Sequence, residues 1–261
     1  MTIKSMLAAS AALVITAAVS AQAAEVAALM GDNTIAIVDT AQKKVVKTWS
    51  ISGVNGKVLG VDVRPADGQL YALAADGGVY TVDTKTGKAT MKSKLETMLP
   101  AGVMATVDFN PAADRLRVMG NDGTSLRVNV DDGKTIKDGS HKFAEADMHK
   151  GEKPNVVAGA YSNSFKGTKE TTLYNIDGTI GALLRQVPPN DGVLNAIGKL
   201  GVKADNVAFD IWSDGQGKNE AWLMVGDTLY SVDLTTGKAT MAAKIAGAKG
   251  MVRDIAILPA M

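Results

Sequence analysis

Four aspartates recur at one point of a repeated apolar pattern, and their side chains could act together. They are Asp62, Asp108, Asp210 and Asp254, whereas a fifth copy of the pattern carries Ala160. Several carboxylates brought to one place supply the oxygen ligands that a hard cation such as Ca²⁺ prefers. The same residues also suit an architectural role, in which each carboxylate binds backbone amides or an arginine of the next repeat. The spacing leaves both roles open.

A second polar group falls in the third copy of the pattern. Arg117 and Arg127 occupy strand positions where other copies carry aliphatic or aromatic residues. A guanidinium binds carboxylate or phosphate through paired hydrogen bonds, so these arginines either pair with an acid such as Asp108 or bind an anionic ligand. The ligand-binding residues predicted around them are Asp108, Arg117, Arg127, Tyr161, Asn163, Asn190, Asp191 and Asn195.

The two histidines of the chain, His141 and His149, flank Glu145. In a helix, this i, i+4, i+8 spacing would place all three side chains on one face, where they could bind Zn²⁺ or Cu²⁺. Gly139-Ser140 before them and Lys150-Gly151 after them favour a loop instead. Two interpretations therefore remain for these three residues: a metal site, or ordinary surface side chains.

The elements that must position these residues follow from an internal repeat. Val79–Met91 and Leu229–Met241 share nine of thirteen residues, and weaker copies surround Asp39, Asn129 and Asp177. Each copy alternates apolar and polar residues, turns through an Asp and a Gly, and returns, which is typical of a β-hairpin. A further strand, which carries the recurrent aspartate, precedes most of the hairpins.

Four-stranded units repeated every 40 to 50 residues or so are typical of a β-propeller. The strand at 252–260 lacks hairpins after it, and the hairpins at 25–51 lack a strand before them, so together they complete one blade. We therefore expect an all-β fold, a five-bladed β-propeller of four-stranded antiparallel blades, closed by pairing the C-terminal strand with the N-terminal strands. The expected blades are 252–260 with 25–51, 57–96, 103–138, 155–187 and 205–246. An open two-sheet sandwich is the alternative.

Two segments are longer than a blade requires, 138–154 and 186–202. We expect both to be long loops, where function is often carried on a rigid scaffold.

The first residues predict export. Lys4, an apolar run and an Ala-x-Ala site have the order of a signal peptide over residues 1–23, followed by one domain over 24–261. The chain has no cysteine, and 28 Lys and Arg against 27 Asp and Glu offer no bulk charge for nucleic acid. We expect a periplasmic or secreted monomer with no membrane span and no nucleic-acid partner.

Several motifs in order resemble one bacterial family. They are Gly60-Val-Asp-Val-Arg-Pro65, Asp108-Phe-Asn-Pro111, Pro154-Asn-Val-Val-Ala158, Pro188-Pro-Asn-Asp-Gly192 and Leu229-Tyr-Ser-Val-Asp233. Together they are similar to the domain-of-unknown-function 4394 family. The resemblance implies an exported, propeller-like domain without an established activity. His149 departs from the family pattern, which more often has Asn there, so the two histidines are particular to this chain.

The chain lacks the common catalytic signatures: it has no Cys nucleophile, no G-x-S-x-G, no H-E-x-x-H and no phosphate-binding glycine loop. We therefore expect a non-enzymatic binding or scaffold module, which recognises an unknown small anionic ligand or a protein partner at the channel mouth. No cofactor is expected apart from Ca²⁺ in the central channel. The alternative is a metal-dependent hydrolase or lactonase that uses the aspartates.

Overall fold

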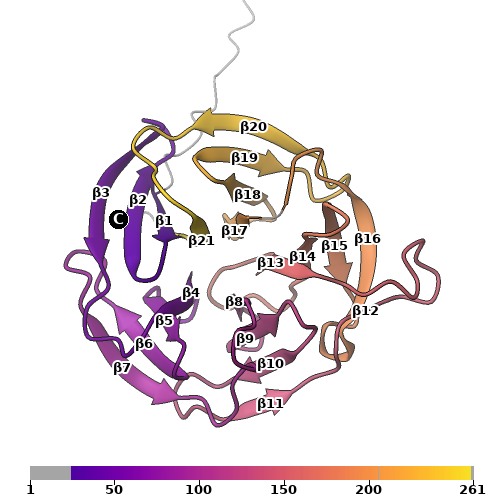
Figure 1. Ribbon diagram of the computed structural model, residues 1–261, viewed down its shortest axis with the longest axis horizontal. Helices are drawn as coiled ribbons and strands as arrows, with labels where there is room; N and C mark the ends of the chain where they lie inside the picture. Colours follow the sequence, from indigo (N-terminus) through magenta and orange to yellow (C-terminus); the bar gives the residue numbers. More distant parts are fainter. Residues whose placement is uncertain (1–24, 205, 260–261) are drawn as a thin grey trace, which may run out of the picture.

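The computed structural model describes residues 25–204 and 206–259, and it forms a ring of five antiparallel sheets (Figure 1). The predicted signal peptide, 1–23, lies outside the described residues. The ring is the predicted five-bladed β-propeller. Within the described part of the chain, no helix has the length and apolar character needed to cross a membrane.

Each blade is a meander of four strands that runs from the centre of the ring to its rim. Blade 1 contains β21 (Val252–Ile257), β1 (Glu25–Met30), β2 (Thr34–Asp39) and β3 (Lys44–Ser50). Blade 2 contains β4 (Val58–Val63), β5 (Leu70–Ala74), β6 (Gly78–Val82) and β7 (Ala89–Lys94). Blade 3 contains β8 (Ala105–Asn110), β9 (Arg115–Gly120), β10 (Ser125–Val128) and β11 (Thr135–Lys137).

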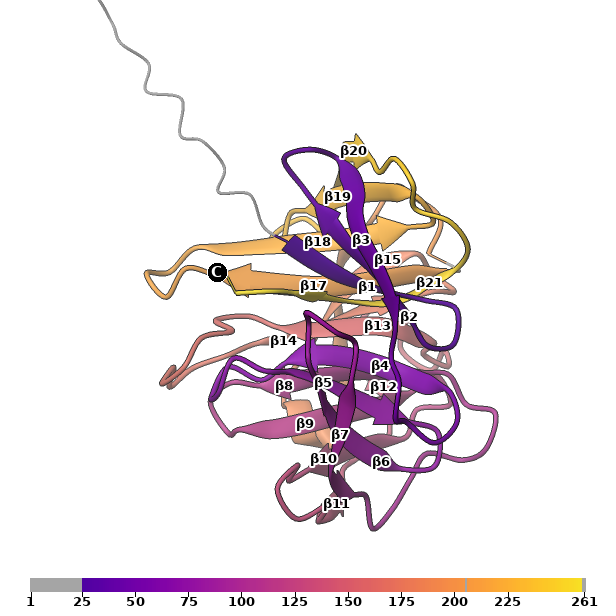
Figure 2. The same cartoon turned by 90° about the vertical axis from the view of Figure 1, so that its left-hand side faces the viewer.

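The remaining two blades complete the ring. Blade 4 contains β13 (Val156–Tyr161), β14 (Leu173–Asp177), β15 (Ala182–Gln186) and β16 (Val193–Lys199). Blade 5 contains β17 (Val207–Ser213), β18 (Asn219–Val225), β19 (Thr228–Val232) and β20 (Ala239–Lys244). The first strands β21, β4, β8, β13 and β17 line the centre (Figure 1), and the side view shows them running alongside one another (Figure 2).

The ring closes as predicted. The C-terminal β21 pairs with β1 in antiparallel register, from Val26 opposite Ile257 to Met30 opposite Val252. Blade 1 is thus assembled from both ends of the described chain.

The residues that the repeated hairpins share form the turns between strands. Asp83 accepts backbone hydrogen bonds from Lys85 and Thr86, and Asp233 accepts the equivalent pair in blade 5. These amide donors lower the pKa of the Asp83 carboxyl. Gly87 and Gly237 both have left-handed backbone, with φ of 76° and 77°. The shared residues are therefore turn chemistry.

The core lies between blades, because successive residues of a strand face opposite sides. Leu70 packs into the apolar cluster shared with blade 1, whereas Tyr71, the next residue, packs into the cluster shared with blade 3. Each blade is therefore buried on both faces, and its neighbours hold it in place.

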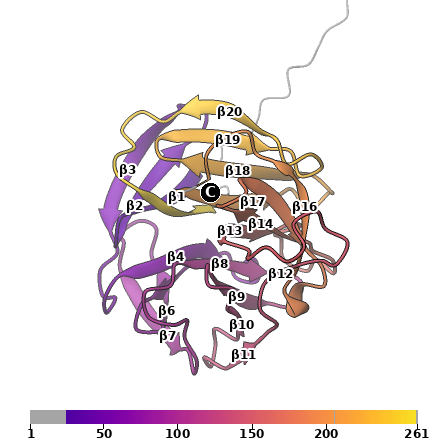
Figure 3. The same ribbon diagram turned by 45° about the vertical axis from the view of Figure 1, so that its right-hand side comes forward.

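Blade 4 corrects the predicted boundaries. The segment 186–202 was expected to be a loop beyond the blade, but it contains β16, the outer strand of blade 4 (Figure 3). Two residues of 138–154 form β12 (Lys142–Phe143), which adds a parallel fifth strand beside β16. β16 could not be recognised from the sequence, because Asn195 and Gly198 interrupt its apolar pattern. The turn residues Pro188–Gly192 just before it also favour a loop.

Candidate functional site

Three of the four recurrent aspartates meet at the centre of the ring. Asp62 on β4, Asp108 on β8 and Asp210 on β17 each offer a carboxylate oxygen, and these oxygens all lie within 4.8 Å of one another. Each side chain belongs to a residue that is 5 or 6% exposed. We call these three residues the central aspartates.

Each central aspartate also joins its blade to the next one. Asp62 accepts a hydrogen bond from the backbone N–H of Phe109 at 2.6 Å, and Asp108 accepts one from Tyr161 at 2.9 Å. Asp210 accepts one from Ile257 at 2.7 Å. These bonds stabilise contacts between neighbouring blades, which is the architectural role left open by the sequence.

Asp254 does not occupy the equivalent place. Asp210 binds the amide of Ile257, just as Asp62 binds that of Phe109, the residue after Asp108. The residue of β21 in register with the central aspartates is therefore Ala256, and Asp254 lies two residues earlier on the same strand face. Its carboxylate accepts from the N–H of Val61 at 3.0 Å.

The neighbouring glycine explains how Asp254 fits. A Cβ on Gly60 would lie 2.6 Å from Oδ2 of Asp254. Any side chain at position 60 would thus push the carboxylate away from the amide that it binds.

The negative charge at the centre has no partner cation. Among the described residues, no Lys, Arg or His forms an ion pair with Asp62, Asp108, Asp210 or Asp254. Burial, reinforced by repulsion from neighbouring aspartates, raises the pKa of Asp62, Asp108 and Asp254 well above the ordinary value. Burial also raises the pKa of Asp210, to about 6. The protonated forms of these four carboxyls are therefore favoured more than in an ordinary aspartate.

Asp62 and Asp210 are among the residues that line a pocket at the ends of β4, β17 and β21. The pocket has a volume of about 270 Å³ and lies where the first strands end. Asp62 and Asp210 line its inner part, Phe165 and Trp212 supply aromatic walls, and the exposed Lys166 lies among its lining residues. We call this cavity the mouth pocket.

The arginines of blade 3 are already paired. Arg117 is 1% exposed, and its guanidinium donates to the Tyr161 hydroxyl, Ser125, Asp138 and Asn190. Arg127 donates two further hydrogen bonds to Asp138. The acid that pairs with both arginines is thus Asp138, rather than the Asp108 suggested by the sequence.

The structure does not bring all the predicted ligand-binding residues together. Arg117, Arg127, Tyr161 and Asn190 form one hydrogen-bonded network with Asp138. No hydrogen bond between described side chains joins that network to the three other predicted residues outside the central cluster. Asn163 binds Asn219 beside the mouth pocket, Asp191 is exposed on the short 3-10 helix η1 (Pro189–Asp191), and Asn195 lies on β16.

The histidine segment is not helical. Residues 141–149 form β12 and turns, His149 contacts Glu152 at 3.1 Å, and Glu145 pairs with Lys150. Both ring nitrogens of the buried His141 lack hydrogen-bond partners, and burial lowers its pKa to about 4. In the described part of the chain, the one group of three acids or histidines close enough to share a metal ion is that of the central aspartates.

Comparison with known proteins identifies the family. The family model described as "Domain of unknown function (DUF4394)" matches residues 34–256. The chain belongs to this family. No curated protein matches the chain.

Solved structures resemble this family member in fold. A protein of unknown function from Bacteroides thetaiotaomicron aligns with a TM-score of 0.50 at 17% identity, over 80% of this chain and 53% of that one. This chain therefore spans about half the length of that protein. A protein of unknown function from Bacteroides caccae aligns with a TM-score of 0.47 at 13% identity, over 92% of this chain and all of that one.

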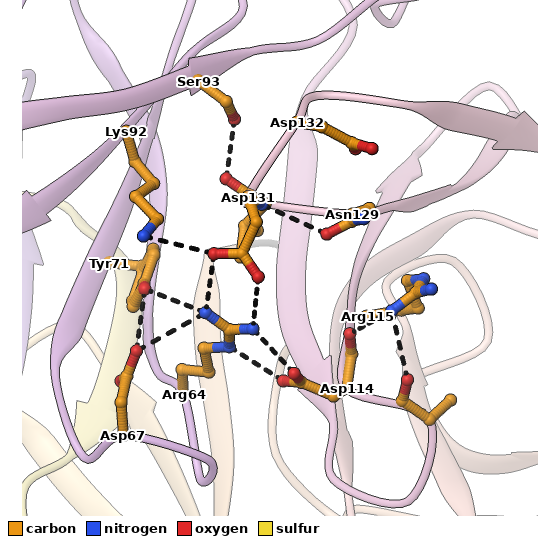
Figure 4. A network of polar contacts seen from close by, with 12 residues as sticks. Arg64, Asp67, Tyr71, Lys92, Ser93, Asp114, Arg115, Asn129, Asp131 and Asp132 are labelled. Atoms are coloured by element: carbon orange, nitrogen blue, oxygen red, sulfur yellow. Dashed lines mark hydrogen bonds and ion pairs between the residues drawn. The ribbon is translucent and has the colours of Figure 1, made fainter.

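One polar cluster of this family member was not found from the sequence. Arg64, which follows β4, donates to Asp114 and Asp131 of blade 3 and to Tyr71 and Asp67 of its own blade (Figure 4). These acceptors raise its pKa. Arg64 stands in the Gly60–Pro65 motif, but its two acidic partners in blade 3 lie 50 and 67 residues away, so only the fold brings them to it.

Proposed function

We propose that this exported β-propeller is a non-enzymatic binding module, and that its site is the mouth pocket. Its ligand carries a cationic group that reaches Asp62 and Asp210. One observation carries the proposal: two carboxylates, each on a residue 6% exposed, line an open pocket and have no ion-pair partner among the described residues.

A buried charge without a partner is costly, so a carboxylate in that position either takes up a proton or binds a cation. A ligand ammonium would supply the missing charge and would be held by two acceptors at once. The aromatic faces of Phe165 and Trp212 in the same pocket suit the apolar part of an amine, and they also attract a cation. The volume of about 270 Å³ restricts the mouth pocket to a small group.

The test is thermal stability at pH 8 with n-butylamine, n-butanol and butyrate at matched concentrations. Binding to the native state alone raises the melting temperature, so we expect n-butylamine to raise it and the neutral and anionic analogues to have no effect. Equal effects of all three would overturn the proposal.

Two variants sharpen this test. Asp210→Asn should abolish the effect of n-butylamine, whereas Asp227→Asn, a partly exposed site outside the pocket, should retain it. Lys166→Gln removes from the lining of the mouth pocket a positive charge that repels the ammonium of n-butylamine, so it should strengthen n-butylamine binding. A purely structural role of the central aspartates would not produce this effect.

Export and assembly are part of the proposal and are tested separately. The mass of the protein recovered from cell fractions should match cleavage after Ala23, with the protein in the periplasm or medium. Size-exclusion chromatography with light scattering should give a monomer. An uncleaved cytoplasmic chain would contradict the assigned location.

A second candidate is a metal-dependent hydrolase or lactonase. The observation that favours it is the approach of three carboxylate oxygens at the centre to within 4.8 Å, a set that would suit Ca²⁺. Elemental analysis of purified protein, repeated on Asp108→Ala, decides between the candidates. Stoichiometric metal lost in the variant would favour this candidate, and metal-free native protein would exclude it.

The predicted small-anion site at Arg117 and Arg127 stays a prediction. The four hydrogen bonds of Arg117 to protein groups favour a structural role for this side chain. Stabilisation by phosphate or citrate that disappears in Arg127→Ala, the more exposed of the two, would support an anion site instead.

A further inference from the structure

The mouth pocket continues outward as a groove over blades 1 and 2. A second cavity of about 400 Å³ shares Gly68 and Pro259 with the mouth pocket. A third, of about 430 Å³, shares Gly68, Leu70, Thr84 and Lys85 with the second. The three cavities therefore adjoin one another from the channel mouth to the outer strands, and we call them together the blade 1–2 groove.

The chemistry of the groove changes along its length. Its inner end holds Asp62 and Asp210. Its middle is largely apolar, with buried Ile37 and Leu70 below and the exposed Val46 beside them.

The outer end of the groove is basic. Lys85 and Lys88, which line the third cavity, are exposed, and neither forms an ion pair with a described residue. The exposed Lys47 lines the second cavity, and its ammonium donates to the backbone carbonyl of Lys85 at 2.6 Å. One acid, Asp83, lines the third cavity, and another, Glu25, lines the second. The Asp83 carboxylate, held by the amides of Lys85 and Thr86, keeps its charge, so Lys85 and Lys88 leave the third cavity with one positive charge in excess.

A ligand that matches all three parts has a cation at one end, an apolar group in the middle and an anion at the other end. We infer that the blade 1–2 groove binds an acidic peptide segment, with its N-terminal ammonium at Asp62 and Asp210. An apolar side chain lies over Ile37 and Leu70, and a following acidic side chain reaches Lys85 and Lys88. This inference rests on the proposed function, because the ammonium uses the same mouth pocket.

A peptide fits better than a sugar polymer. Sugar recognition commonly uses aromatic platforms, but the aromatic residues lining these cavities, Phe165 and Trp212, both lie in the mouth pocket. The separation of a negative end from a positive end also fixes the direction of a dipolar chain.

The experiment measures fluorescence anisotropy of dye-labelled peptides on the whole domain. The probe is Gly-Leu-Glu-Glu with the dye at its blocked C-terminus, and its relatives are the N-acetylated form and Gly-Leu-Lys-Lys. We expect the free N-terminal acidic peptide to bind, and each relative to bind at least about tenfold more weakly, a difference that corresponds to about 1.4 kcal/mol. Equal binding of the acidic and basic peptides would overturn the inference.

A glycine at the junction of the cavities allows a blocking variant. Gly68 has φ of 71°, and a Cβ there would meet no atom within 4 Å. Asn tolerates this conformation, so Gly68→Asn adds a side chain where the cavities meet and should abolish peptide binding. Gly102→Asn is the matched control, since Gly102 has φ of 82°, equally open space and no place in the groove.

The outcomes separate the inference from the proposed function. If n-butylamine stabilises the domain but the peptide does not bind, the groove inference fails and the mouth pocket stands. If neither binds, both fail. Both variants are first checked for native circular dichroism. Peptide binding that survives Gly68→Asn, or that is lost equally in Gly68→Asn and Gly102→Asn, would also overturn the groove.

Discussion

Two charge clusters of this propeller, one around Arg64 and one formed by the central aspartates, differ in whether their acids have cationic partners. Around Arg64, one buried cation lies among three acids from two blades, and Lys92 adds a second positive charge on Asp131 (Figure 4). At the centre of the ring, three buried acids lie together with no cation among the described residues. Both clusters join neighbouring blades, but only in the Arg64 cluster does each carboxylate have a cationic partner within the protein.

The difference separates architecture from a candidate site. A buried ion pair completed within the protein needs nothing further, and the Arg64 and Arg117 networks are of this kind. The central aspartates satisfy their backbone partners and still carry unmatched charge. Repetition of an acid around the ring is therefore explained by structure, whereas its lack of a counter-charge among the described residues is the basis of the proposed site.

The largest expected effect is on a completed pair. Arg117→Met leaves the buried Asp138, whose side chain is 4% exposed, with Arg127 alone as its cation, and it removes the donor to Tyr161, Ser125 and Asn190. Breaking a buried pair costs about 3–5 kcal/mol, and since Arg127 remains we expect a loss near 3 kcal/mol. Urea denaturation should show this loss in the free energy of unfolding. Lys244→Met, at an exposed pair with Asp227, is the control and should change it by less than about 1 kcal/mol. Similar losses in both variants would contradict the assignment.

The central cluster should instead be revealed by pH. Because the folded pKa of Asp210 is raised to about 6 from an ordinary 3.8, the native state binds the proton more tightly than the unfolded chain. Stability from this group is complete below pH 4 or so and is lost as pH rises through about 6, by roughly 3 kcal/mol. About 1.4 kcal/mol of this is lost between pH 5 and pH 8, one pH unit below the folded pKa and two above it. Unfolding free energies at these two pH values measure that part, and Asp210→Asn should flatten the difference. A domain more stable at pH 8 than at pH 5 would refute this account.

The smallest effect belongs to the Arg64 cluster, with the opposite sign. Hydrogen bonding to Arg64 lowers the pKa of Asp131, so its contribution is present above the ordinary carboxyl range and is lost as pH falls through the lowered value. Asp131 is half exposed, so Asp131→Asn should cost about 1 kcal/mol or less near neutral pH. Melting temperatures of the variant and the parent should converge in acid. A gap that widens in acid would show that Arg64 does not stabilise the Asp131 carboxylate.

The fold could be predicted because local turn chemistry repeats. The turn at Asp83 and Gly87 depends only on neighbouring amides and a residue with left-handed backbone, so it can be recognised in the sequence. The number of its copies predicts the number of blades. β16 was missed because Asn195 and Gly198 break its alternation, and its place as an outer strand is set by tertiary pairing with β15.

The site could be predicted only in part. Matching Asp254 to Asp62 by residue type fails because a shift of two residues keeps the same strand face. One signal would have shown it: Pro65 and Pro111 follow their aspartates by three residues, whereas Pro259 follows Asp254 by five. The partners of Arg64 and the cavities over blades 1 and 2 arise from contacts distant in sequence, which no local pattern records.

Closure of the ring by β21 has a consequence for the order of folding. A ribosome or a translocation channel releases a chain from its N-terminus, so β1 to β3 emerge long before the strand that completes their sheet. Until residues 252–257 arrive, β1 exposes an unpaired inner edge and its apolar residues lack the cover of β21. The blade that is first in synthesis is therefore the last that can be finished, and the chain needs protection from aggregation until its final strand is free.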